Sequence, residues 1–133
     1  MNLRYALIMV AVLCAGCATM NIQNQLDKLD ASLREYGSAL RWGYYKHAHG
    51  YHVGRDGTIP EVNFERLEGF SVTGYEVIEK FVNDEGTGAE VLVRIGYYDE
   101  QYGKLNVIKQ KQSWWFNEEY KRWFNEAPFP EFK

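Results

Sequence analysis

Cysteine is almost absent from this sequence of 133 residues, and both cysteines lie near its start. After Cys17 the chain has no further thiol, so the part that carries the fold cannot contain an internal disulfide. Proline is also scarce. Pro60 interrupts a glycine-rich stretch, and Pro128 and Pro130 fall close to the end. We therefore expect an extended, irregular tail.

Long apolar runs and an excess of basic charge are missing as well. The apolar stretch YALIMVAVL is shorter than the ~20 residues that a membrane-spanning helix needs. The formal net charge is -3, which gives no general attraction to nucleic acid or to anionic lipid. We therefore expect neither a transmembrane helix nor a nucleic-acid partner.

Motifs that commonly carry catalysis do not occur in the sequence. No serine stands in a nucleophile-elbow pattern, and no glycine-rich loop follows a predicted strand to hold phosphate. The acidic segment NDEGTG lacks the alternating oxygen ligands of a calcium loop. We predict no enzymatic activity, no catalytic residue and no cofactor.

The first seventeen residues have a pattern of their own. A short positive start, MNLR, precedes the apolar run, and Leu13, Cys14, Ala15, Gly16 and Cys17 follow it. This order resembles the lipobox of bacterial lipoproteins, except that Cys14 stands where leucine is usual. The resemblance implies cleavage between Gly16 and Cys17, a diacylglyceryl group on the Cys17 thiol, and acylation of the new amino terminus.

Two other interpretations of these residues stay open. One is an ordinary signal peptide that releases a free protein, and the other is a redox or zinc CxxC pair, which here lacks a second ligand pair. For a lipoprotein, Ala18 and Thr19 stand where an aspartate would cause retention in the inner membrane. The resemblance therefore implies the outer membrane, with the domain facing the periplasm. The expected division is a signal peptide (1–16), lipidated Cys17 with a polar tether (17–24), and one domain (25–133).

Apolar residues at helical spacing follow the tether. Their separations of four, three, four, three and four place them on one stripe, which predicts a helix that ends between residues 43 and 50. Ala39, Trp42 and Tyr44 are expected to widen the stripe. The stripe consists of Ile22, Leu26, Leu29, Leu33, Tyr36 and Leu40.

The second half of the chain alternates with a period of two. The segment from Phe70 changes parity at Gly74, which predicts a bulge, and Ala89 to Tyr97 alternates without interruption. Two further strands are expected in KLNVIKQKQSWWF and YKRWF, and the short turns between strands make the sheet antiparallel. We predict an α+β fold with one long N-terminal helix packed on a curved antiparallel sheet of about four strands. Its expected inward positions include Val91, Val93, Ile95, Tyr97, Val107 and Trp114.

The segments QSWWFNEEYKRWF and PFPEF, with this order of elements, resemble short proteobacterial lipoproteins with an NTF2-like or cystatin-like domain. That resemblance implies a helix cradled by a curved sheet over residues 22 to 132. It implies no catalytic residue, because extra helices that close the pocket in the enzymes of that family have no counterpart between residues 50 and 68.

Two groups of side chains are candidates for a site. His47, His49 and His52 are close enough in sequence to be weak metal candidates, although no cysteine or placed carboxylate completes a ligand set, and we expect exposed histidines at a helix end. Successive residues of a strand point to opposite faces, so Trp114 and Trp115 cannot both be in the core. We predict that Trp115, Trp123 and Tyr98 contribute to a surface that contacts a ligand or partner.

These observations favour a lipid-anchored periplasmic binding or accessory domain. Its partner would be an envelope protein or a small apolar or glycan ligand. The alternatives are a small NTF2-like enzyme of the lyase, isomerase or hydrolase type, and a structural lipoprotein subunit of an envelope complex.

Overall fold

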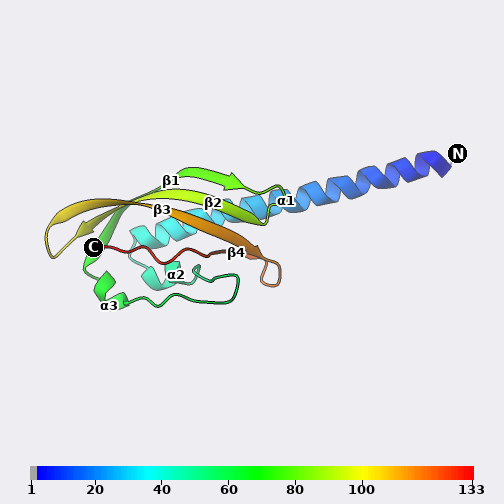
Figure 1. Cartoon of the computed structure of the whole chain (residues 1–133). Helices are drawn as coiled ribbons and strands as arrows, with labels where there is room; N and C mark the ends of the chain where they lie inside the picture. Colours follow the sequence, from blue (N-terminus) through cyan, green and yellow to red (C-terminus); the bar gives the residue numbers. More distant parts are fainter. Residues whose placement is uncertain (1–2) are drawn as a thin grey trace.

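The computed structural model describes the backbone of residues 3–133 and the side chains of residues 20–133. The chain forms an α+β fold in which a curved four-stranded sheet arches over the C-terminal half of a long helix (Figure 1). The predicted cleavage site at Gly16 and the predicted lipid site at Cys17 lie outside the described side chains. Among the described residues, no helix is both long and apolar enough to cross a membrane.

Helix α1 spans Leu3–Arg41. It runs through residues 18–24, where we expected a polar tether, so the chain enters the domain as a continuous helix. The predicted stripe is confirmed over its second half, because Leu29, Leu33, Tyr36 and Leu40 are buried.

The end of α1 differs from the expectation in one respect. The helix stops at Arg41, and Gly43 adopts a left-handed conformation with φ +74 that turns the chain away from the helix axis. Trp42 and Tyr44, expected to widen the buried stripe, are instead 74% and 65% exposed. The turn takes both rings off the face that packs on the sheet.

Two short helices follow in the glycine-rich middle of the chain. Helix α2 spans Tyr45–His49 and helix α3 spans Phe64–Leu67. The Asn63 side chain caps α3 by accepting a hydrogen bond from the Arg66 backbone N–H. Both helices lie below the sheet (Figure 1).

The sheet has the order β1-β2-β3-β4, with all neighbours antiparallel. One register shift in the β1–β2 pair falls between Val72 and Gly74, which confirms the predicted bulge, and a second falls between Val77 and Glu79. The strands are β1 (Phe70–Val82), β2 (Gly88–Asp99), β3 (Lys104–Asn117) and β4 (Arg122–Asn125).

The predicted alternation is confirmed in β2, where every second residue from Ala89 to Tyr97 is buried. Trp114 of β3 is buried as expected, but Val107 is 64% exposed. The two residues are an odd number of positions apart in a strand that pairs with β2 without a register shift, so they must point to opposite faces. Gln112, not Val107, shares the inner face with Trp114.

The C-terminal tail closes the core under the sheet. Phe132 is fully buried, with its ring centroid 4.8 Å from that of Tyr97 and 5.8 Å from that of Phe70. The Tyr97 hydroxyl donates to the Lys133 carbonyl oxygen at 3.1 Å. The tail therefore contributes aromatic side chains to the same core as α1.

Candidate functional site

The interior contains a hydrogen-bonded pair of titratable side chains. His52 and Tyr36 are both fully buried, and the His52 Nε2 lies 2.7 Å from the Tyr36 hydroxyl oxygen. The other ring nitrogen, Nδ1, lies 2.8 Å from the Ala127 carbonyl oxygen. A carbonyl oxygen only accepts, so Nδ1 carries the proton and the Tyr36 hydroxyl donates to Nε2.

Burial controls the ionisation of this pair. Removal from water lowers the pKa of His52 from its usual 6.5 to about 4, although the hydrogen bond to the Ala127 carbonyl opposes the shift. Burial also raises the pKa of Tyr36 well above its usual value, and the neighbouring Tyr75 adds to that increase. Both side chains are therefore neutral at physiological pH.

A second polar network connects the sheet with the tail. The Gln112 Oε1 accepts from the Trp114 indole N–H at 2.9 Å, and the Gln112 Nε2 donates to the Gln110 Oε1 at 3.0 Å. Gln110 in turn donates to the Pro128 carbonyl oxygen at 2.9 Å. The buried Gln112 amide and the half-buried Gln110 amide are therefore both hydrogen-bonded to neighbouring protein groups, which is what a structural role requires.

A third cluster lies at the surface, where α1 meets the segment after α2. Glu35 accepts hydrogen bonds from the Tyr51 hydroxyl and from the His47 Nε2, the latter at 3.0 Å. These two contacts lower the pKa of Glu35. The Arg122 guanidinium lies 5.0 Å from the centroid of the Tyr51 ring. The cluster joins α1, α2 and β4 at their exposed edges.

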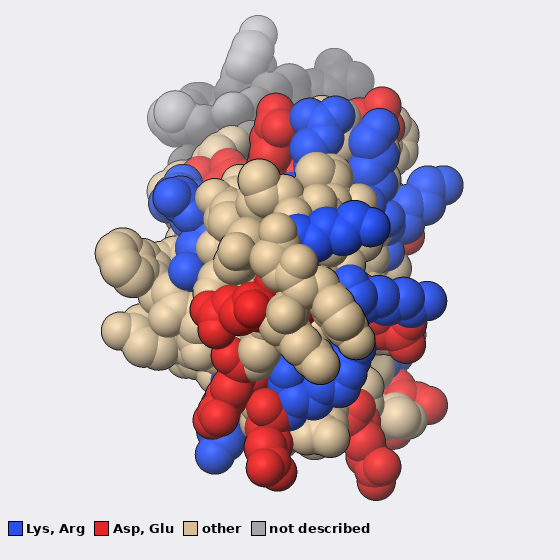
Figure 2. All heavy atoms as spheres, turned by 90° about the vertical axis from the view of Figure 1, so that its left-hand side faces the viewer, with Lys and Arg blue, Asp and Glu red and all other residues tan. Residues whose placement is uncertain are grey.

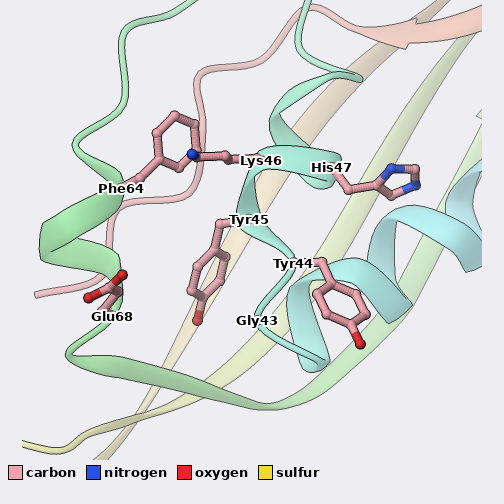
Figure 3. A pocket seen from close by; sticks show the side chains of 7 residues that line it. All are labelled: Gly43, Tyr44, Tyr45, Lys46, His47, Phe64 and Glu68. Atoms are coloured by element: carbon pink, nitrogen blue, oxygen red, sulfur yellow. The ribbon is translucent and has the colours of Figure 1, made fainter.

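The described part of the chain has an aromatic groove of about 650 Å³ next to the C-terminal end of α1. We call it the end groove, and its position between α2 and α3 is drawn in Figure 3. This volume lies within the range typical of ligand sites. The side chains that line it come from Tyr44, Tyr45, Lys46, His47, Phe64 and Glu68.

A smaller hollow of about 300 Å³ lies beside the same turn, between α1 and β1. Its lining includes Trp42, Tyr75 and Val77. Trp42 and Tyr44, separated only by Gly43, thus border two adjoining depressions with exposed rings. Exposed aromatic side chains grouped in this way are typical of interaction sites.

The aromatic residues predicted for a surface do not form one site. Trp123 has an exposed fraction of 0% and lies in the core, because it pairs with Phe116 on the inner face of the sheet. Its indole N–H donates to the Gln25 carbonyl oxygen of α1 at 2.8 Å. Trp115 and Tyr98 are half-buried, and the Trp115 indole N–H donates to the Val53 carbonyl oxygen.

The three histidines lie in three different environments. His47 is exposed as expected, but His49 is half-buried with its Nε2 2.7 Å from the Pro60 carbonyl oxygen, and His52 is in the core. The expectation of three exposed helix-end histidines is therefore wrong for His49 and His52. Among the described residues, no three histidine, cysteine or acidic side chains are grouped so that they could hold a metal ion.

Sequence reasoning missed the end groove. Its rings come from Tyr44 and Tyr45 on one side and from Phe64 on the other, which are far apart in the chain. The only local signal is Gly43, since a glycine after a long helix can turn the following aromatic residues outward.

No protein-family model matches this chain, and no curated protein or solved structure shows a significant similarity to it.

Proposed function

We propose that this protein is a lipid-anchored accessory domain at the outer membrane, facing the periplasm, which binds another envelope protein through the end groove. The observation that carries the proposal is the exposed aromatic groove beside the turn at Gly43. The lipobox-like residues up to Cys17 support the membrane anchor.

The length of α1 supports this arrangement. From Cys17 to Arg41 a helix rises about 36 Å at 1.5 Å per residue. The N-terminus and the end of the domain that carries α3 lie at opposite ends of the molecule (Figure 1). A helix of this length would hold the end groove away from the bilayer surface, where a periplasmic protein can reach it.

The buried polar pair supports binding over catalysis as the function of this domain. Catalysis by Tyr36 and His52 would require that a substrate reach them, and both side chains have an exposed fraction of 0%. Their hydrogen bonds are made to each other and to the Ala127 carbonyl oxygen. The end groove, in contrast, is open and lined mainly by aromatic side chains.

Site-specific photo-crosslinking in living cells tests the proposal. A photoreactive amino acid replaces Tyr44 in the groove or Tyr120 in the β3–β4 turn, two tyrosines of matched exposure at 65% and 67%. We expect position 44 to give a discrete adduct with an envelope protein, and position 120 to give none. The adduct should weaken when Cys17 is replaced by serine. Equal adducts at the two positions, or none at position 44, would contradict the proposal.

A further inference from the structure

The end groove combines aromatic rings with a carboxylate. Tyr44, Tyr45 and Phe64 supply the rings, and Glu68 follows α3 on the same side of the groove as Phe64 (Figure 3). The face of an aromatic ring carries negative electrostatic potential and attracts cations. A carboxylate beside such rings adds a formal negative charge, so this lining favours a positively charged group.

The chain itself already places an ammonium group there. The Lys46 Nζ lies 5.8 Å from the centroid of the Phe64 ring, which is within the range of a cation–π contact. Figure 3 shows the Lys46 side chain reaching across the groove to that ring. The ring face therefore suits an ammonium group, and a ligand that carries one would compete with Lys46.

The surroundings of the groove are acidic on one side. Burial raises the pKa of Tyr45, and the negative charge of Glu100 adds to the increase. Glu61 and Glu65, on the segment that carries α3, are exposed. Figure 2 shows more acidic side chains in the lower half of this end of the molecule than in the upper half, with basic side chains among them.

The size of the groove says more about the ligand. Its volume of about 650 Å³ is much larger than an ammonium group alone requires, and the rest of its lining is mainly aromatic, with Lys46 and His47 as the other polar side chains. An alkyl chain that ends in an ammonium group satisfies both features, because the methylenes pack on the rings while the charge meets the carboxylate. The lysine side chain has this composition.

We propose that the end groove is a lysine-recognition site, in which a lysine side chain of the partner protein lies on Tyr44 and Phe64 with its ammonium group near Glu68. The inference rests on the proposed function, since it names the chemistry by which the partner is recognised. The methylenes of the incoming side chain cover the face of Phe64 that Lys46 covers in the free protein, so Lys46 has to move aside.

Two probes that differ only in charge test the inference. Nα-acetyl-lysine-N-methylamide and its norleucine analogue are titrated into the full chain in nonionic detergent, and backbone amide shifts are followed by NMR. We expect the lysine probe to shift the amides of Tyr44 to His47 and Phe64 to Glu68. It should bind about threefold or more tightly than the norleucine probe, as a cation–π contact at an exposed site predicts. Equal binding, or tighter binding of norleucine, would overturn the inference.

Variants with matched controls test the contributions of Glu68 and Lys46 to binding of the lysine probe. Glu68→Gln should weaken binding of the lysine probe about twofold to fivefold. Glu65→Gln, which changes an exposed acid of α3 outside the groove lining, should not weaken it. Lys46→Met should strengthen binding of the lysine probe, because the competing ammonium group is removed. Lys28→Met, which removes an ammonium over Phe116, is its control. No gain from Lys46→Met, or an equal loss from both glutamate variants, would argue against the site.

The test also separates this inference from the proposed function. If the lysine probe does not bind but the crosslinked partner at position 44 is still captured, the groove is a docking site of different chemistry. If the probe binds in the groove and no partner is captured, lysine recognition stands and the proposed function fails.

Discussion

The His52 imidazole and the Tyr36 hydroxyl lie 2.7 Å apart in the core, and this hydrogen bond joins α1 to the segment after α2. Through the His52 Nδ1–H and the Ala127 carbonyl oxygen, the same imidazole also holds the tail. One buried side chain therefore connects three segments that are distant in the sequence. This makes its charge state important for the stability of the fold.

Acid should destabilise the protein through His52. The unfolded chain binds a proton near pH 6.5, whereas the pKa of the buried imidazole is about 4. Between these values the unfolded state binds more protons, so the free energy of unfolding decreases as the pH falls from about 6.5 to about 4 and levels off below. The total loss from this group is on the order of 3 kcal/mol. Urea unfolding at stepped pH measures it.

His52→Gln is the control for that experiment. The variant should be less stable than the wild type at pH 7. The glutamine side chain does not titrate, so the free energy of unfolding of the variant should also decrease less steeply between pH 6.5 and pH 5. This window avoids Glu35, whose pKa is held below its usual value by Tyr51 and His47 and which matters only in stronger acid. An unchanged slope in the variant would show that other groups cause the pH dependence.

Tyr36→Phe should cost about 1–3 kcal/mol of stability. The ring still fills its place among the neighbouring aromatic side chains, but the buried His52 Nε2 loses the hydroxyl that donates to it. Tyr102→Phe, at an exposed turn residue, should change stability by less than about 0.5 kcal/mol. Denaturant unfolding compares the two, and equal effects would mean that the buried hydroxyl does not stabilise the fold.

Gly37→Ala tests packing against helix propensity. Propensity alone predicts a gain of up to about 1 kcal/mol at this position, which lies inside α1 near its C-terminal end. A Cβ atom at this position would, however, lie 2.5 Å from the Tyr75 Cδ1, inside the core contact between α1 and β1. We expect a net loss of about 1–2 kcal/mol by thermal or chemical unfolding. Ser38→Ala, on the exposed face of the same turn, should be neutral or stabilising, and a similar gain at Gly37 would refute the packing argument.

Gln112→Leu should destabilise the sheet by about 1–3 kcal/mol, because the Trp114 indole N–H loses its acceptor in the core. The near-equal volume of leucine limits any cavity, so the loss reports on the hydrogen bonds. Gln101→Leu in the exposed β2–β3 turn provides the comparison. Shifted tryptophan fluorescence in the Gln112 variant alone would locate the effect at Trp114.

Cys17→Ser should abolish lipidation and leave an unprocessed precursor. Metabolic labelling with a fatty acid, followed by mass spectrometry of the purified protein, measures both outcomes. Cys14→Ser is the matched control, because the neighbouring thiol is not the expected acceptor, and it should remain labelled. Equal label in the wild type and the Cys17 variant would end the lipoprotein hypothesis.

Local periodicity in the sequence was sufficient for the packed part of α1 and for the strands. The spacing of Leu29, Leu33, Tyr36 and Leu40 predicted the buried stripe of α1, since one turn of helix brings every third or fourth residue to the same face. The alternation in β2 predicted its buried face, and the parity change at Gly74 predicted the bulge.

The tertiary structure alone decided which of these faces are covered, and by what. Trp123 is buried because β4 pairs with β3 in a register that turns its ring toward α1, and His52 is buried because the tail folds over it. The end groove exists only because α2 and α3 lie side by side. The sequence by itself determined the period of each element, a property of neighbouring residues, whereas burial and pocket formation depend on contacts between segments far apart in the chain.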